Sequence, residues 1–230
     1  MTEQVSRRTD GRKVFLLGTA REGSTRIKDK MLRPFAGTTL FNIYLGKMKA
    51  LWSSGLFAGW GVAIPRGDAR LLGVVEREQV PVILERPRID PSPQPRNQEL
   101  YYLAERAESH VMWINACLPL LPASTLEKMA RKFLSDGDYN CMEPVILRKN
   151  WFYHLNGKPA NKHATSTQMT EGMYESSQAA HIFEREYLLR TGQYFKEAPS
   201  LWAVEPEDCA DIDYEYEFRF AEAEYIRRQG

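Results

Sequence analysis

Residues 13–30, KVFLLGTAREGSTRIKDK, join a short apolar run to a glycine-bearing loop that is rich in Arg and Lys. The apolar run, Lys13–Leu17, is typical of a buried strand, and a turn signal follows it at once. A loop that contains Gly18 and Gly23 can bring backbone N–H groups against phosphate oxygens, while its basic side chains supply positive charge. The stretch therefore predicts a strand leading into a triphosphate-binding loop, whose basic residues are Arg21, Arg26, Lys28 and Lys30.

The two glycines of this loop also have the outer spacing of a Walker A motif. That motif requires a lysine directly after its second glycine, and this chain has Ser24 there. The ordinary P-loop NTPase is therefore excluded. A second interpretation, an ordinary basic turn after a strand, stays open on composition alone.

Three further short apolar runs indicate buried strands: Trp60–Ile64, Val80–Leu84 and Val111–Ile114. Between them, Leu40–Leu51 and Ser124–Leu134 have the apolar spacing of surface helices, and Ser124 and Glu127 stand at the spacing of a capping box. Strand alternating with helix over residues 13–134 predicts an α/β domain with a mostly parallel sheet and helices on both faces. Ligands of such sheets bind beyond the carboxyl ends of the strands.

The composition limits the partners of the chain. Its 230 residues, 43% of them hydrophobic, are enough for one sizeable core, and 31 Lys and Arg against 30 Asp and Glu leave a net charge of +1. No general field therefore favours nucleic acid or an anionic membrane. No run approaches the about 18 apolar residues of a spanning helix, and the polar N-terminus lacks an apolar signal core. Three scattered cysteines, Cys117, Cys141 and Cys209, argue against a disulfide framework, so we expect a cytoplasmic protein.

The chain changes character after residue 139, where shorter and more polar pieces follow. A Gly157–Pro159 turn between two candidate strands predicts a hairpin excursion, which we place as a lobe at about 143–178. Further patterns predict a return segment and two helices, at Ala179–Phe183, 185–190 and 214–228. We therefore expect a single domain over residues 1–230 with one inserted lobe.

Five sequence blocks follow one another along nearly the whole chain: AREGSTRIKDKMLRPFAGTTL at 20–40, LERP at 84–87, INACLPLLP at 114–122, ESSQAAHIF at 175–183 and DIDYEYEFRFAE at 211–222. The first resembles the A-R-x-G-S-x-R-x-x-x-K signature of the cytidylyltransferases that make CMP-sialic acid and CMP-Kdo, and the others resemble later segments of that superfamily. Spore-coat polysaccharide nucleotidyltransferases have a similar opening. The resemblance implies a Rossmann-like, GT-A-like nucleotidyltransferase fold, usually a dimer in which the lobe lies over the partner's active site. It also implies transfer of CMP from CTP to an acceptor, with release of pyrophosphate and with Mg²⁺ as cofactor.

The resemblance assigns roles to residues of this chain. Arg21 and Lys30 match the phosphate-binding Arg and Lys of the family, and we take them as the catalytic cations. The other nucleotide-binding candidates are Ala20, Gly23 and Ser24 in the loop, Arg86 in the LERP block, and Arg96 and Asn97 for contacts with the base or a phosphate.

Asp211 and Asp213 stand two residues apart just before the last helical pattern. In an extended segment both carboxylates point to the same side, so together they can hold a hard cation such as Mg²⁺ beside phosphate oxygens. The alternative is an ordinary helix N-cap, which the spacing alone favours. The resemblance to the family's D-I-D favours the metal site. Glycosyltransferases that use sugar nucleotides also have a D-x-D, but usually after a central strand.

The chain departs from the family pattern on the acceptor side. Cys117 stands where Kdo-activating members have a metal-binding Asp, and Asn115 stands where sialic-type members have a Gln that contacts the acceptor. In the lobe, residues 165–170 replace an Arg-rich segment, which removes bidentate partners for a sugar carboxylate. We take Asn115, Lys162 and Gln168 as acceptor-binding candidates. We expect an acidic acceptor, either another 2-keto sugar acid or a small phosphonate or phosphate ester.

Three alternatives stay open. The enzyme uses another nucleoside triphosphate, or the chain is a nucleotide-binding homologue without catalysis, or it is a glycosyltransferase that consumes a sugar nucleotide. The four histidines show no metal-ligand spacing, so we expect no zinc site. The expected partners are CTP, a small acidic acceptor and a second copy of the chain, without nucleic acid or membrane.

Overall fold

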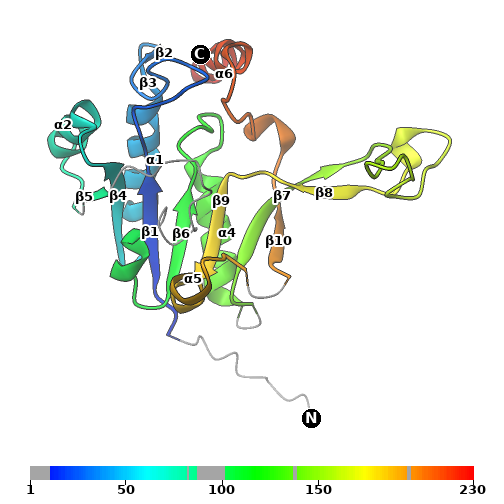
Figure 1. The fold of residues 1–230 in the computed structure, drawn as a ribbon, viewed down its shortest axis with the longest axis horizontal. Helices are drawn as coiled ribbons and strands as arrows, with labels where there is room; N and C mark the ends of the chain where they lie inside the picture. Colours follow the sequence, from blue (N-terminus) through cyan, green and yellow to red (C-terminus); the bar gives the residue numbers. More distant parts are fainter. Residues whose placement is uncertain (1–10, 82, 87–101, 137–138, 196–197) are drawn as a thin grey trace.

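The computed structural model describes residues 11–81, 83–86, 102–136, 139–195 and 198–230. The strands of its main sheet are β1 (Val14–Thr19), β4 (Gly59–Pro65), β5 (Ile83–Arg86), β6 (His110–Ile114), β7 (Met142–Arg148), β8 (Met173–Ser176), β9 (Ala180–Glu184) and β10 (Ser200–Ala203). They are arranged in the order β10–β7–β9–β6–β1–β4–β5, with β8 paired to β7 (Figure 1). A small second sheet pairs β2 (Pro34–Phe35) with β3 (Thr38–Thr39).

Strand β1 lies inside the sheet and pairs in parallel with β4 on one side and β6 on the other. Its residues Val14–Leu17 are buried, as expected for a continuous apolar run in a sheet that is covered on both faces. β5 and β10 also pair in parallel with their neighbours, whereas β9 runs antiparallel to β6 and β8 antiparallel to β7. The prediction of a mostly parallel sheet is therefore confirmed.

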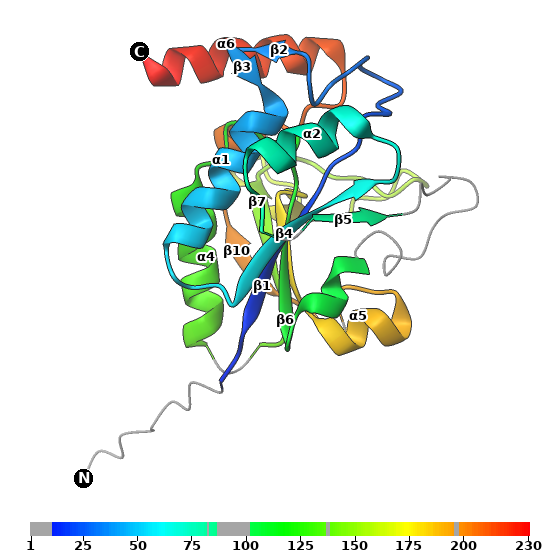
Figure 2. The ribbon, with the colours of Figure 1, turned by 90° about the vertical axis from the view of Figure 1, so that its left-hand side faces the viewer.

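Helices cover both faces of this sheet (Figure 2). α1 (Leu40–Ser53), α2 (Ala69–Arg77) and α4 (Ala123–Ser135) contribute to a large apolar core on one face. The 3₁₀ helix η1 (Tyr102–Arg106) and α5 (Arg185–Thr191) contribute to a smaller core on the other. The predicted α/β architecture is confirmed.

The C-terminal helix α6 (Glu215–Gln229) packs beside the small sheet. Phe218 of α6 meets Phe35 of β2 edge-on, with 5.2 Å between ring centroids. This contact joins the end of the chain to the segment that follows the glycine-bearing loop.

Within the described ranges, no helix is long and apolar enough to cross a membrane.

Three local details differ from the sequence-based expectations. Helix α4 has Pro122 as its N-cap, so Ser124 lies inside the helix and does not form a capping box with Glu127. Strand β5 begins at Ile83 rather than at Val80. Helix α2 is not expected from the sequence, because it has only 9 residues and includes Gly73, which disfavours a helix.

The lobe expected at 143–178 begins later in the chain. β7 and β8, at its two ends, are strands of the main sheet, and residues 149–172 between them project away from it (Figure 1). The turn at Gly157 is present, with φ of 81°, and beside it Tyr153 and Pro159 form an isolated antiparallel bridge. The projecting segment exposes large apolar side chains, among them Tyr153, Leu155 and Met169.

Candidate active site

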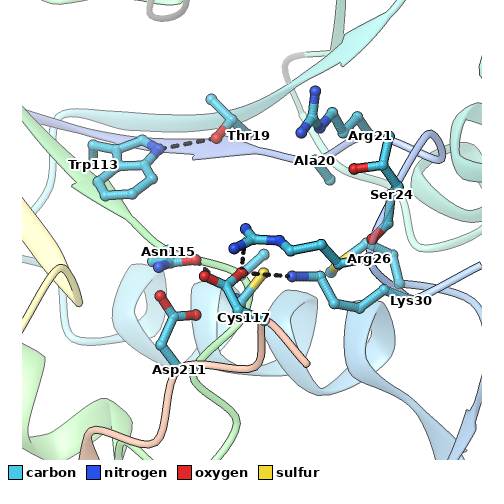
Figure 3. A pocket seen from close by; sticks show the side chains of 14 residues that line it. Thr19, Ala20, Arg21, Ser24, Arg26, Lys30, Trp113, Asn115, Cys117 and Asp211 are labelled. Carbon is cyan, nitrogen blue, oxygen red and sulfur yellow. Dashed lines mark hydrogen bonds and ion pairs between the residues drawn. The ribbon is translucent and has the colours of Figure 1, made fainter. Parts of the chain in front are cut away.

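One cavity of about 350 Å³ lies at the carboxyl ends of β1 and β6 (Figure 3). The loop after β1 contributes Arg21, Ser24 and Lys30 to its lining. The segment before α6 contributes Asp211 and Asp213. The glycine-bearing loop and the paired acids, nearly the whole chain apart in sequence, therefore line one cavity.

Direct contacts hold the two segments together. Lys30 Nζ donates to the backbone oxygen of Ile212 at 2.5 Å and lies 3.6 Å from Asp213 Oδ1. Arg26 donates to Asp213 Oδ1 at 2.6 Å. The side chain of Ile212 is fully buried, and its backbone N–H donates to the oxygen of Cys117 at 3.1 Å. Because Ile212 points into the core, its two acidic neighbours point toward the cavity, as the alternation of an extended segment requires.

Asp211 is the most unusual acid of the site. Its Oδ1 atom is buried and has no hydrogen-bond partner among the described residues. Burial raises the pKa of this carboxyl to about 6; the Asp213 charge adds to that effect and Lys30 opposes it. A buried carboxylate oxygen without a partner is costly, and a bound cation would relieve that cost.

The donors present fit a magnesium ion that is shared with phosphates. The described part of the chain has no cluster of three or more His, Cys, Asp or Glu residues that could hold a metal by itself. Mg²⁺ does not need such a cluster, because it usually takes one or two carboxylates and completes its shell with water and phosphate oxygens. Asp211 and Asp213 supply that number of carboxylates.

The start of α6 fixes the position of Asp213. Glu217, in the first turn of the helix, accepts hydrogen bonds from the backbone N–H of Asp213 at 2.7 Å and of Tyr214 at 2.9 Å. The Arg26 guanidinium lies over the Tyr214 ring, 5.5 Å from the ring centre. The helix cap therefore orients both partners of the Arg26–Asp213 ion pair.

Gly18 allows close packing between the end of β1 and α1. A Cβ atom at this position would lie 2.3 Å from the hydroxyl oxygen of Tyr44. Tyr44 is buried and donates to the backbone oxygen of Ile114 at 3.3 Å, so it has little room to move. The glycine lets α1 pack closely against the end of β1.

The structure brings together seven of the residues to which the sequence analysis assigned a role in binding or catalysis, since the cavity is lined by Ala20, Arg21, Ser24, Lys30, Asn115, Asp211 and Asp213; Arg26 and Cys117 line it as well. Gly23 lies in the same loop but not in the lining. Arg86 is the last residue of β5, where its backbone lies opposite Pro65. Arg96 and Asn97 lie outside the described residues. Lys162 and Gln168 lie on the projecting segment and do not line this cavity.

Asn115 has a structural part as well as a place in the cavity. Its Nδ2 donates to the backbone oxygen of Gln178 at 3.1 Å, and its Oδ1 accepts from the N–H of Cys117 at 2.9 Å. The amide therefore ties the turn after β6 to the segment that enters β9. An acceptor contact would use the remaining N–H or lone pair.

Sequence reasoning missed Trp113 and the specific contact of Arg26. The Trp113 indole N–H donates to Thr19 Oγ1 at 2.9 Å, and its ring stacks on that of His181 at 5.2 Å. Trp113 stands one residue before the end of β6, and that position at a carboxyl edge was an available signal. The partner of Arg26 had no such signal, because 187 positions separate Arg26 from Asp213.

Comparisons with known proteins define the fold class. No protein-family model matches the sequence, and a search of curated proteins gave no match. Among solved structures, a CMP:2-keto-3-deoxy-manno-octonic acid synthetase complexed with CTP superposes with a TM-score of 0.68 at 10% identity, covering 94% of this chain and 100% of that one. A 4-diphosphocytidyl-2C-methyl-D-erythritol synthase from Anaerococcus prevotii superposes at 0.69 with 12% identity, covering 96% and 98%. The bifunctional IspDF of Campylobacter jejuni gives 0.60 at 12% identity, over 90% of this chain and 54% of that one.

The chain therefore has the Rossmann-like fold of nucleotidyltransferases. The expected resemblance to cytidylyltransferases is confirmed at the level of the fold.

Proposed function

We propose that this protein is a CTP-dependent cytidylyltransferase, which transfers CMP from CTP to an acidic acceptor and releases pyrophosphate. The observation that carries the proposal is the meeting of the basic loop and the paired acids around one cavity. Transfer of a nucleotidyl group needs cations on the triphosphate and carboxylates for a metal ion, in one place. The cavity offers both.

Each group has a defined task in this proposal. Arg21 and Lys30 bind the triphosphate and stabilise the charge that moves onto pyrophosphate as an acceptor oxygen attacks the α-phosphorus. Arg26 exchanges Asp213 for a phosphate oxygen when the nucleotide binds. Asp211 and Asp213 hold Mg²⁺, which when bound neutralises phosphate charge and orients the reacting groups.

The choice of CTP rests on the structural neighbours, two of which are named for cytidylyl chemistry and one of which was solved with CTP. Arg86 stays a candidate contact to the nucleotide, and Arg96 and Asn97 stay candidates for the base or a phosphate. Use of another nucleoside triphosphate is the main alternative.

The acceptor side of the proposal involves a second copy of the chain. Lys162 and Gln168 belong to the segment 149–172, which projects from the main sheet (Figure 1), and neither lines the cavity of its own chain. A homodimer in which this segment reaches the partner's cavity would bring them to the acceptor, and its exposed apolar side chains would contact the partner. An acidic acceptor suits a lysine in that position. We place the enzyme in the cytoplasm.

The test is pyrophosphate release by the purified protein with Mg²⁺. CTP, UTP, ATP and GTP are each combined with a panel of 2-keto sugar acids, phosphonates and phosphate esters, and sugar nucleotides are offered separately. We expect release with CTP and one acceptor class, and at least a roughly 100-fold loss in Lys30→Ala. The proposal is contradicted if none of the four nucleotides gives pyrophosphate release, or if Lys30→Ala keeps full activity. Consumption of a sugar nucleotide supports the glycosyltransferase instead.

A further inference from the structure

Arg70, at the start of α2, holds two loop residues, each of which is next in the chain to one of the two proposed phosphate-binding cations. Its Nε donates to Glu22 Oε2 at 2.7 Å, and one terminal nitrogen donates to Asp29 Oδ1 at 2.5 Å. Glu22 follows Arg21 in the chain, and Asp29 precedes Lys30. One guanidinium therefore ties down the backbone next to both cations.

Glu22 is bound more firmly than an ordinary surface acid. Besides Arg70 Nε, its carboxylate accepts from the backbone N–H groups of Arg70 at 2.9 Å and Leu71 at 3.2 Å, where the N-terminus of α2 favours negative charge. Its own N–H donates to Asp68 Oδ2 at 2.8 Å, and Asp68 is buried. Isolated surface ion pairs contribute little, but several hydrogen bonds on one carboxylate that is 17% exposed restrain it well.

Asp29 needs such a restraint because of its backbone. Its φ is +57°, a left-handed conformation that is uncommon outside glycine. Its carbonyl accepts from the N–H groups of Leu32 and Arg33, which closes the turn that presents Lys30. The Arg70 guanidinium also lowers the pKa of the Asp29 carboxyl, so the ion pair persists to a more acidic pH than an ordinary aspartate would allow.

We infer that Arg70 is a positioning residue for the triphosphate, which sets the spacing of Arg21 and Lys30 by clamping Glu22 and Asp29. The inference rests on the proposed function. Arg70 does not line the cavity, and its Nε and one terminal nitrogen are engaged by the two acids, so it acts through the loop rather than on the nucleotide. A lysine would not replace it, because a single ammonium lacks the planar fork that reaches two carboxylates.

The first experiment compares Arg70→Ala with Arg77→Ala in the full-length protein. Arg77 lies on the same helix, is exposed, and makes no hydrogen bond or ion pair with any described residue, so its removal takes away the same charge and leaves the contacts of Glu22 and Asp29 intact. Because a misplacement of about 1 Å can cost about 100-fold in rate, we expect Arg70→Ala to lower kcat/KM by roughly 10- to 100-fold and to weaken CTP binding in calorimetry. Arg77→Ala should resemble the wild type in both.

A second readout separates positioning from a general loss of stability. Hydrogen exchange of the free protein should speed up in residues 20–33 of Arg70→Ala and stay unchanged in the central strands β1 and β6. Asp29→Gly removes the clamped carboxylate but adopts the positive φ without strain, so it should bind CTP better than Asp29→Ala and still less well than the wild type. Removing Arg70 in the Asp29→Gly background should cost less than in the wild type.

The outcomes distinguish the two ideas. If the wild type binds CTP and Arg70→Ala binds it equally well, the clamp is overturned and the cytidylyltransferase stands. Faster exchange throughout the protein would also overturn it, because Arg70 would then serve global stability. If the wild type binds no CTP, the proposed function fails and the inference fails with it.

Discussion

At the scale of the single residue, Asp211 combines a cost in stability with a use in binding. Its buried Oδ1 atom lacks a partner in the described part of the chain, whereas Asp213, two positions away, has the Arg26 ion pair. Burial raises the pKa of Asp211 to about 6. The folded state therefore retains a proton that the unfolded chain has already lost, and stability falls as pH rises from about 4 to about 6.

Asp211→Asn should therefore make the protein more stable and less active. At pH 7 the amide removes the buried charge, and we expect the free energy of unfolding to rise by about 2 kcal/mol. The fall in stability between pH 4 and 6 should become smaller, as urea denaturation at several pH values would measure. Mg²⁺-dependent pyrophosphate release should drop by orders of magnitude.

Asp213→Asn is the matched control for that gain in stability. It breaks an existing ion pair, so it should lower activity without stabilising the fold. Equal stabilisation by both substitutions, or destabilisation by Asp211→Asn, would show that Asp211 is not strained in the free protein.

At the scale of the element, the first turn of α6 determines where Asp213 lies. Glu217 caps the helix by accepting from the N–H groups of Asp213 and Tyr214, and the same bonds fix the Asp213 backbone. A loss of the cap should therefore affect catalysis as well as the helix.

Glu217→Ala should cost about 1 kcal/mol of stability, the usual value for a lost cap, and raise the Mg²⁺ concentration needed for half-maximal activity. Glu217→Gln keeps an acceptor oxygen and should lie between the alanine variant and the wild type. Titration of activity with Mg²⁺ and thermal unfolding provide the measurements. An alanine variant that unfolds more easily but keeps its Mg²⁺ dependence would limit Glu217 to helix stability.

At the scale of the whole molecule, the segment 149–172 projects from the main sheet and exposes several large apolar side chains. Leu155, at its tip, is fully exposed, and Met169 is 76% exposed. Large apolar side chains gathered on a projection are typical of an interface between subunits.

We expect the wild type to sediment as a dimer and the double variant Leu155→Asp, Met169→Asp to sediment as a monomer. Because the lobe also carries Lys162 and Gln168, the monomer should lose acceptor turnover while it still binds CTP. Trp52→Asp, an exposed aromatic on α1, is the control and should stay dimeric. A double variant that remains dimeric and active would contradict the role given to the lobe.

The sequence by itself determined what depends on neighbours along the chain. Val14–Leu17 is apolar at every position, which is typical of a buried strand. The spacing of Asp211 and Asp213 predicted that both face one side if the segment is extended. Composition and its place after that strand left the glycine-bearing loop either a triphosphate-binding loop or an ordinary basic turn, and the family resemblance favoured the first. Helix α2 escaped notice, because a short helix with an internal glycine has little periodicity to detect.

Only the tertiary structure decided which of these local features meet. The contact of Lys30 with the Ile212 carbonyl, the Arg26–Asp213 pair, the hydroxyl of Tyr44 against Gly18 and the grip of Arg70 on Glu22 and Asp29 all join segments that are far apart in the chain. Such contacts depend on how successive strands cross over and on which helix face is buried. No pattern within a short stretch of sequence specifies which distant segments come into contact. The residue types and local spacing of the loop and of the paired acids can therefore be read from the sequence. Only the packing of the sheet and its helices brings the two segments to one cavity.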